Sequence, residues 1–459
     1  YMGFRYIGIE GIAPENIEVS AIALYSDFEE TGSFACSDPL LNQLQSNIRW
    51  SGKSNFVDIP TDCPQRDERM GWTGDISVFA KTACFNFDLA AFLEKWLYDV
   101  RAEQGHGGGL PLVVPKQGIA APTVATACWA DCIVLVPWAE YLARGDKELL
   151  RTMYPAMKKY LKAVRFWASL SGPGKYRRHI WKWLFQFGDW CAPEGGIIDW
   201  MKRGREIATA YYANSCRIVS EIARILGKSE DAEYYASLSE KIGEAFRHVF
   251  TDGKGTLKKE FQTGYVLPLA FGLEEGAERE MMAQNLDRLV RERGYHLSTG
   301  FTGTPHILFA LADGGKAETA YKLLLQDTAP SWLACIKEGA TTTWEEWTID
   351  PNKEGNIPSY NHYAYGAVGD FLYRRVAGIE PTEGGYKCFS VRPVLGGGLT
   401  YAKASVKTPY GTAASEWHLD GGKFSLKVTV PVSCTCRVTM PKGKQMTLQS
   451  GEYEWEEEV

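Results

Sequence analysis

The sequence predicts a mainly α-helical protein, an α/α toroid, with β-strands toward both ends of the chain. Three observations lead to this prediction. About twelve runs with the apolar spacing of amphipathic helices fill the region from residue 35 to residue 380. Short turns and long loops alternate between these runs, as they do where inner and outer helices alternate around a ring. An open solenoid is the competing architecture, but the sequence has no repeat of fixed length.

The two ends of the chain carry the period of two that is typical of β-strands. In residues 1–34 the alternation includes Ile17 and Val19. Two or three strands cannot form a domain alone, so we expect these residues to be the terminal strands of an incomplete N-terminal β-domain. Residues 381–459 alternate in short runs separated by turn residues, as at positions 420–422. They predict a C-terminal antiparallel β-sandwich domain.

The helical domain, residues 35–380, opens with an apolar stripe that includes Leu41, Leu44 and Ile48. Later helices are expected in pairs joined by tight turns: residues 129–144 with 147–169, 206–226 with 230–250, and 306–312 with 317–325. A last long helix is expected over residues 361–376. Long aromatic loops such as SGPGKYRRHIWKWLFQFGDWCAPEGG interrupt the pairs, and loops of that length are usually functional.

Composition narrows the classes of partner. The 459 residues suggest roughly two to four domains. The net charge of −6 and the lack of a long basic run argue against nucleic acid. No apolar run approaches the roughly 18 residues that span a bilayer, and the first residues do not form a secretory signal. Eleven scattered cysteines, an odd number, favour reduced thiols. We therefore expect a cytoplasmic protein, with a homo-oligomer left open.

Nothing in the sequence indicates a metal or another cofactor. Cys128 and Cys132 lie four residues apart, and Cys434 and Cys436 lie two apart. Neither pair has a second pair or a histidine at the spacing of a zinc site. The glycines of GHGGGLPLVVP are not followed by the Gly-Lys-Ser/Thr of a phosphate-binding loop. The predicted cofactor set is empty.

The most informative stretch is DIPTDCPQRDERMGWTGD, residues 58–75, which combines acids, arginines and a tryptophan. Pro60 and Pro64 exclude a regular helix from its first half, so its acids lie on a constrained loop. Such a loop suits sugar chemistry, because a carboxylic acid can protonate a glycosidic oxygen and Trp72 can pack on a sugar ring. The competing interpretation is a solvated turn of ion pairs. The prolines, the glycines and Trp72 favour the functional interpretation.

Two further stretches carry candidate residues. In GATTTWEEWTID, Glu345 and Glu346 lie between two tryptophans, and we expect one of the two acids to line a cleft. His362 begins the last predicted helix, where a lone histidine is more often structural, although its nearness to Glu345 favours a role in the site. The motif FGDW contributes Trp190, and Trp129 in CWAD is a weaker candidate because a tryptophan on a helix usually belongs to the core.

Four stretches together, DCPQRDERMGWTGD, FNFDLAAFLEKW, GATTTWEEW and NHYAYGAVGDFLY, resemble the signature sequences of the bacterial α-L-rhamnosidase family of glycoside hydrolases. The resemblance covers residues 34–380 and continues into the C-terminal β-domain. It implies an (α/α)6 barrel flanked by β-sandwiches. It also implies hydrolysis of terminal, non-reducing α-L-rhamnose with inversion at the anomeric carbon. The chain is expected to depart from the family by lacking most of the N-terminal β-domains that usually precede the barrel.

The resemblance also assigns roles to individual residues. Glu68 takes the position of the general acid and Glu345 that of the general base. The sugar-binding positions fall on Asp62, Arg66, Trp72, Asp75, Trp129, Trp190 and His362. A resting general acid must be protonated, so we expect the pKa of Glu68 above its ordinary value of about 4.3. For inversion, the two carboxylates should lie about 6.5–9.5 Å apart.

Three alternatives stay open. The first is another glycosidase on an α/α toroid, acting on unsaturated uronic acids or on trehalose-like glucosides. The second is a rhamnose-binding protein without catalysis, which the intact acid and base positions argue against. The third is a helical scaffold for protein partners, which would bury its indoles and bind no sugar.

Overall fold

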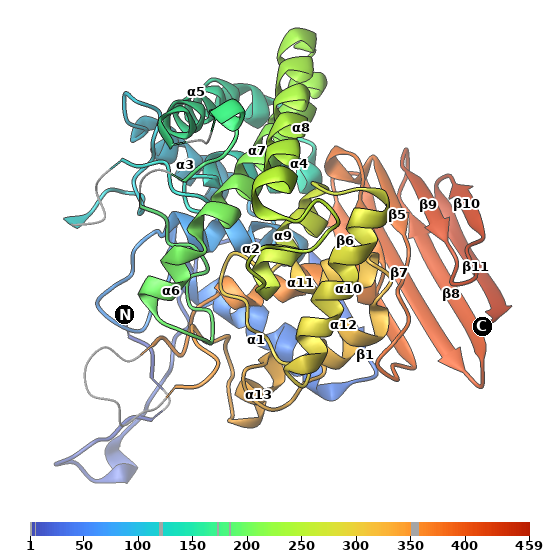
Figure 1. Cartoon of the computed structure of the whole chain (residues 1–459). Helices are drawn as coiled ribbons and strands as arrows, with labels where there is room; N and C mark the ends of the chain where they lie inside the picture. The colour runs from blue at the N-terminus through green and yellow to red at the C-terminus, as the bar shows by residue number, and fades with distance from the viewer. Residues whose placement is uncertain (1, 5, 119–122, 172–173, 183–184, 350–357) are drawn as a thin grey trace.

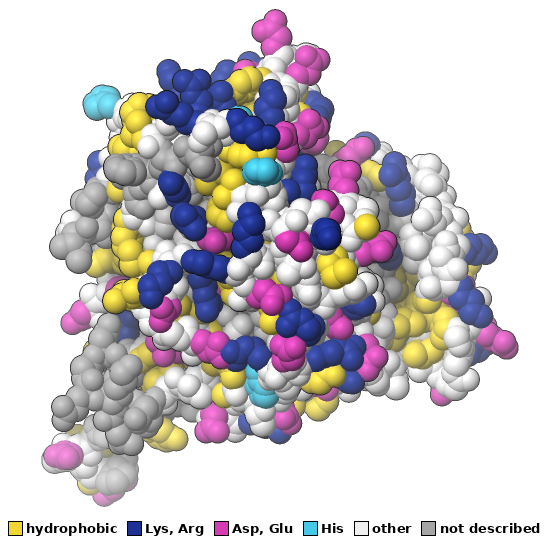
Figure 2. All heavy atoms as spheres, viewed as in Figure 1, with side chains coloured by type: hydrophobic (Ala, Val, Ile, Leu, Met, Phe, Trp, Pro, Cys, Tyr) yellow, Lys and Arg dark blue, Asp and Glu magenta, His cyan; other side chains and the backbone are white. Residues whose placement is uncertain are grey.

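The computed structural model describes residues 2–4, 6–118, 123–171, 174–182, 185–349 and 358–459. The helices form a ring of two layers, and the C-terminal strands form two sheets on one side of this ring (Figure 1). Figure 2 shows acidic and basic side chains side by side over most of one face, with a gathering of Lys and Arg at the top. Among the described residues, no helix is both long enough and apolar enough to cross a membrane. All eleven cysteines are free and buried.

The inner layer consists of helices that pack on one another in chain order around the ring. The helix α2 packs on α4, α4 on α7, α7 on α9 and α9 on α11. The segment around residue 366 packs on α2 and so closes the ring. The bounds are α2 (Thr73–Asn86), α4 (Cys132–Arg144), α7 (Gly204–Ile225), α9 (Gln262–Phe271) and α11 (Ile307–Asp313).

The outer layer alternates with the inner one along the chain, so the predicted toroid is confirmed. Its helices are α1 (Pro39–Asn55), α3 (Ala90–Ala102), α5 (Lys147–Ser171), α8 (Ser229–Phe250), α10 (Gly276–Glu292) and α12 (Ala317–Leu324). Two short helices lie in the long loops, α6 (Ile197–Lys202) and α13 (Trp332–Lys337).

The tight turns have local causes in the sequence. Between α4 and α5, Gly145 adopts φ 77°, a left-handed conformation that ends the inner helix at little steric cost. The next residue, Asp146, accepts hydrogen bonds from the N–H groups of Glu148 and Leu149 at 2.7 and 3.0 Å, which caps the outer helix. One turn of this kind therefore reverses the chain from the inner to the outer layer.

The last inner segment differs from the single helix that the sequence predicts over residues 361–376. It is a 3-10 helix (Ala364–Val368), one α-helical turn (α14, Gly369–Phe371) and a π-helical turn (Leu372–Val376). The hydroxyl of Thr82 on α2 donates to the carbonyl of Ala367 at 3.0 Å and accepts from the N–H of Asp370 at 2.9 Å. The Thr82 hydroxyl thus hydrogen-bonds two backbone groups that would pair with each other's neighbours in a regular helix, which accounts for the change in winding.

The β-structure forms two sheets. One has the order β1-β6-β7-β8-β11 and the other β10-β9-β5-β4. The strands are β1 (Gly32–Cys36), β4 (Ile379–Pro381), β5 (Cys388–Val391), β6 (Tyr401–Thr408), β7 (Gly411–Asp420), β8 (Lys423–Val430), β9 (Thr435–Thr439), β10 (Gln445–Leu448) and β11 (Gly451–Glu458). A two-stranded ribbon, β2 (Phe56–Val57) with β3 (Ile59–Pro60), lies before the first acidic loop.

Two expectations for the β-structure were wrong. The sheets are not purely antiparallel, because β5 pairs with β9 in parallel after a connection that passes through the other sheet. Residues 1–34 were expected as strands, but the described part of residues 2–31 contains no strand beyond an isolated bridge at Glu30. A strand needs a neighbour for its backbone hydrogen bonds, and only β1 has one, the strand β6.

Candidate functional site

The predicted site residues gather where the inner helices begin. Glu68 lies in the loop that precedes α2, Asp75 lies in the first turn of α2, and Trp129 lies in a turn just before α4. Trp190 precedes α7, and Glu345 lies in the long connection before the last inner segment. Trp129 is therefore not on a helix, contrary to the sequence prediction, because α4 begins only at Cys132.

The loop from Asp62 to Met70 is fixed by its own hydrogen bonds. The N–H of Asp62 donates to the carbonyl of Met70 at 3.1 Å, and the N–H of Met70 donates to Asp62 Oδ1 at 3.1 Å. Arg69, at φ 48°, donates from Nε to the carbonyl of Pro64 at 3.1 Å. The constrained loop that the prolines predict is thus built around a carboxylate that is almost fully buried.

Glu68 is bound by an arginine and an indole. Arg66 donates to Glu68 Oε2 from Nη2 at 2.7 Å and from Nε at 3.1 Å, and Trp72 Nε1 donates to Oε1 at 3.2 Å. Partial burial disfavours the charge of Glu68, but a hydrogen bond from Asp62 and the charge of Arg66 outweigh it and lower the pKa of Glu68 below 4.5. The expectation of a raised pKa for Glu68 alone was wrong, because the sequence does not reveal these partners.

The raised pKa belongs to Asp62. Burial, together with the charges of Asp75 and Glu68, raises the pKa of Asp62 from 3.8 to about 7. Since Asp62 and Glu68 share a hydrogen bond, one proton is held by the pair in the neutral range, and it rests on Asp62. The carboxyl group that holds the proton is therefore that of Asp62, which lies beside Glu68, and not that of Glu68 as expected.

Glu345 faces Glu68 across Arg66. Its Oε2 lies 3.6 Å from Arg66 Nη2 and accepts a hydrogen bond from the N–H of Ser359 at 2.7 Å. Because Glu68 Oε2 lies 2.7 Å from the same Nη2, the two carboxylate oxygens are at most about 6.3 Å apart. The nearest oxygens thus lie closer together than the spacing of about 6.5–9.5 Å expected for an inverting enzyme, so this distance does not confirm that expectation. The side chains of Glu68 and Glu345 are 28% and 18% exposed, so a substrate can reach both.

His362 and Asp75 form the floor of the site. Nε2 of His362 lies 3.0 Å from Asp75 Oδ1, and both side chains are almost fully buried. Burial alone disfavours the imidazolium, but the hydrogen bond with Asp75 and the charges of Asp75 and Glu345 raise the pKa of His362 to about 9. Nδ1 of His362 has no partner among the described residues, so one polar atom of this ring is left for a ligand.

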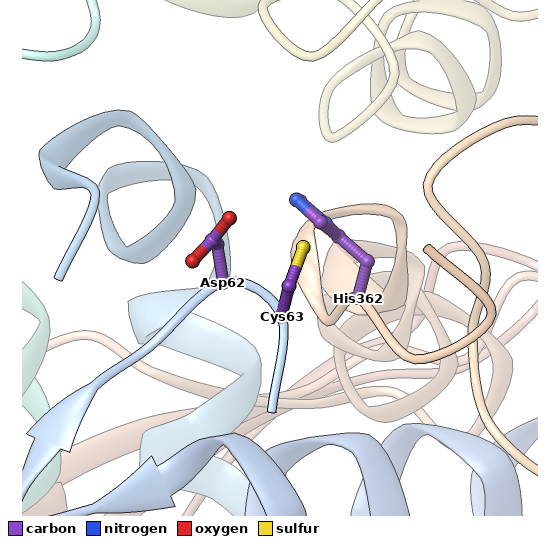
Figure 3. A group of neighbouring side chains, drawn as sticks. All are labelled: Asp62, Cys63 and His362. Carbon is purple, nitrogen blue, oxygen red and sulfur yellow. The ribbon is translucent and has the colours of Figure 1, made fainter. Parts of the chain in front are cut away.

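Asp62, Cys63 and His362 lie together in Figure 3, with ligand atoms within 4.8 Å of one another. Metal ligation needs a thiolate and a neutral imidazole. Burial and the charge of Asp62 raise the pKa of the Cys63 thiol far above its ordinary value, and His362 is protonated at neutral pH. A metal ion would have to displace both protons to bind here.

The aromatic residues form one wall around Phe187. The ring of Phe187 lies 4.3 Å from that of Trp129, 5.1 Å from that of Trp190 and 6.4 Å from that of Trp72, between ring centroids. Nε1 of Trp129 is buried without a partner among the described residues, which leaves a donor for a ligand. Sequence reasoning did not single out Phe187, although its place in the aromatic loop with FGDW could have indicated it.

The wall is held in position by a buried carboxylate. Asp189 is fully buried and accepts hydrogen bonds from the hydroxyls of Thr263 and Thr302 and from the N–H of Gly300, at 2.8, 3.1 and 2.9 Å. The carbonyl of its neighbour Trp190 accepts from the N–H of Phe301 at 2.8 Å. These contacts join the aromatic loop to α9 and to the segment before α11, so Asp189 orders the wall from behind.

Comparisons with known proteins agree with this architecture. A family model described as the bacterial alpha-L-rhamnosidase 6 hairpin glycosidase domain matches residues 29–376. A second model, the bacterial alpha-L-rhamnosidase C-terminal domain, matches residues 378–454. Two similar curated proteins are named alpha-L-rhamnosidase. The one from Formosa agariphila is 38% identical over 98% of this chain and 48% of its own length. The one from Streptomyces avermitilis is 38% identical over 96% of this chain and 42% of its own length.

Solved structures show the same similarity. The native rhamnosidase of Aspergillus terreus superimposes with a TM-score of 0.88 and is 36% identical, over 94% of this chain and 50% of that one. The Streptomyces avermitilis enzyme complexed with L-rhamnose superimposes with a TM-score of 0.86 and is 35% identical, over 95% and 43% of the two chains. The chain spans about half the length of the curated relatives it matches.

Proposed function

Because this chain belongs to the bacterial α-L-rhamnosidase family of six-hairpin glycosidases, we propose that it hydrolyses terminal, non-reducing α-L-rhamnosides with inversion at the anomeric carbon. The observation that carries this proposal is the arrangement of Glu68 and Glu345 on the two sides of Arg66, with Asp62, whose pKa is raised to about 7 by burial, beside Glu68. An acid and a base that face each other across a space open to substrate are what glycoside hydrolysis requires.

The proposed reaction uses two proton transfers. Glu345 removes a proton from a water molecule as the water oxygen bonds to the anomeric carbon. The glycosidic bond breaks at the same carbon, while the proton that rests on Asp62 passes to Glu68 and from Glu68 to the departing aglycone oxygen. Glu345 then releases its proton to solvent, and Asp62 takes one up from solvent. The sugar leaves with the opposite anomeric configuration, as β-L-rhamnose.

Sugar binding is assigned to the floor and the wall of the site. Nδ1 of His362 and Nε1 of Trp129 are buried polar atoms without partners among the described residues, and an unpaired buried donor costs free energy that a sugar hydroxyl would remove. Asp75 holds His362 in place, and Trp72 and Trp190 offer aromatic faces for the ring carbons. Arg66 bridges the two carboxylates until the substrate enters.

A substrate panel tests the function. It contains p-nitrophenyl glycosides, trehalose and an unsaturated uronyl glycoside. Turnover of the α-L-rhamnoside, with no turnover of the α-D-glucoside or of trehalose, is the expected result. Preference for an unsaturated uronyl substrate or for trehalose would assign the chain to another activity of toroid glycosidases. Binding of L-rhamnose by calorimetry without any turnover would indicate a binding protein, and absence of both would favour a scaffold.

Three further predictions complete the proposal. The division into residues 1–34, 35–380 and 381–459 stays a prediction. So does a cytoplasmic location, which the eleven free cysteines support. The proposed partner is a carbohydrate with a terminal rhamnose, and a homo-oligomer stays open.

A further inference from the structure

A second cavity lies inside the ring, away from the candidate active site. Its volume is about 180 Å³, well above the roughly 10–15 Å³ that one water molecule needs. Its basic lining comes from the later part of several inner elements: Lys81 of α2, Arg217 of α7 and Arg374 of the π-helical turn. Arg217 lies thirteen residues into its helix, or about 20 Å from the end that faces the active site.

The charges around this cavity do not balance. Asp370 pairs with Arg374, Asp313 pairs with Arg375 and Arg392, and Glu380 pairs with Arg374 and Arg375. Three carboxylates are thus matched by three arginines. Lys81, Arg217 and Arg279 remain, and none of them forms a salt bridge with a carboxylate in the part of the chain that the structure describes. Arg217 donates instead to the side-chain oxygen of Asn214, which is neutral, at 2.8 Å.

A helix end accounts for one of these three cations, Arg279, but not for Lys81 and Arg217. The inner helices point their C-terminal ends the same way, and cations stabilise such ends within the last turn. Arg279 does so, since it donates to the carbonyl of Leu269 near the end of α9 at 2.8 Å. Lys81 and Arg217 lie five and eight residues before the ends of their helices, beyond that range.

The cavity also contains one hydrogen-bond acceptor without a partner among the described residues, on Asp370. Asp370 is 6% exposed, and its Oδ1 has no hydrogen-bond partner among the described residues, while Oδ2 accepts from Arg374 at 2.8 Å. A ligand that fits must therefore present negative oxygens to Lys81 and Arg217 and a hydrogen-bond donor to Asp370. The cavity is open to solvent beside Arg217, which is exposed and also borders an outer crevice between α7 and α8.

We propose that this cavity binds a protonated oxoanion, the hydrogen phosphate group of inorganic phosphate or of a phosphate monoester. Its charged oxygens accept from Lys81 and Arg217, and its P–OH donates to Asp370 Oδ1. Sulfate has the same charge and shape but carries no proton at neutral pH. Its oxygen would therefore be repelled by the carboxylate oxygen of Asp370 instead of donating a hydrogen bond to it. The site is separate from the proposed rhamnosidase site, and the inference does not depend on that activity.

Isothermal titration in phosphate-free buffer at pH 7.5 tests the proposal. The intact chain should bind one inorganic phosphate, and sulfate should bind at least tenfold more weakly. Lys81→Met and Arg217→Gln should each weaken phosphate binding at least tenfold. The matched controls Lys162→Met and Arg151→Gln, both at exposed positions on α5, should change nothing. Equal binding of phosphate and sulfate, or full binding by both cavity variants, would overturn the proposal.

Two further measurements test the proposal even if Lys81→Met and Arg217→Gln fail to fold. Phosphate should raise the melting temperature of the unmodified chain more than sulfate does at equal ionic strength, and equal shifts would contradict the site. Asp370→Asn replaces the carboxylate with an amide, which can donate a hydrogen bond to an oxygen of either anion. The variant should therefore show a smaller preference for phosphate over sulfate. A phosphate monoester that competes with inorganic phosphate would identify the ester as a ligand, and failure to compete would restrict the site to the free ion.

Discussion

The proton shared by Asp62 and Glu68 leads to a sharp prediction for Asp62→Asn. In the unmodified chain the pair holds a proton with a pKa of about 7, so about half of the molecules carry it at pH 7. The amide group of the variant cannot hold this proton, and the charge of Arg66 still lowers the pKa of Glu68. Fewer molecules would then carry a proton for the leaving group at neutral pH. The rate at pH 7 should fall by about 10²–10⁴-fold, the contribution that is typical of general acid catalysis.

The assay is the pH dependence of kcat/KM on a natural rhamnoside. The alkaline limb, which reports loss of the acid's proton, should move from about pH 7 to lower pH, and the rates of the two enzymes should converge in acid. The control is Asp67→Asn, an exposed acid of the same loop, which should leave the profile unchanged. A uniform loss at every pH would show that Asp62 only binds substrate, and an unmoved limb would refute the shared proton.

Three other predictions concern the two glutamates, the wall and the thiols. Glu68→Ala should damage natural rhamnosides by about 10²–10⁴-fold but spare a dinitrophenyl rhamnoside, whereas Glu345→Ala should damage both; equal losses for Glu68→Ala would move the acid elsewhere. Asp189→Ala should lower the free energy of unfolding by about 3 kcal/mol or more in a urea titration, because it leaves three buried donors unpaired, and a change below about 1 kcal/mol would contradict its ordering role. All eleven cysteines should react with a thiol reagent only after denaturation, and disulfides in unreduced protein would contradict the free thiols.

The sequence was most informative where one local pattern determines one local structure. The spacing of apolar residues predicted the alternating helices, and Gly145 marks a turn because its left-handed conformation ends α4 there. Pro60 and Pro64 predicted the irregular loop that carries Glu68. Seven of the nine candidate residues lie in the stretches that carry the resemblance, whereas Trp129 and Trp190 lie outside them, and all nine lie close together in the fold.

The missed features depend on residues that are far apart in the chain or on contacts that a motif does not specify. The pKa of Glu68 is set by Arg66 and Asp62 in three dimensions, and a motif does not say which acid holds the proton. The broken winding after residue 363 follows from Thr82, almost 300 residues earlier. The alternation in residues 1–34 was real, but a strand forms only where a neighbouring strand accepts its hydrogen bonds.

The most direct test of the proposed mechanism is proton NMR of p-nitrophenyl α-L-rhamnopyranoside during its cleavage by this chain. The first sugar signal should be the anomeric proton of β-L-rhamnose, which later equilibrates with the α-anomer. Initial release of α-L-rhamnose would contradict inversion and the roles of Glu345 and Glu68. No release beyond that of a Glu68→Ala, Glu345→Ala double variant would contradict the proposed function itself.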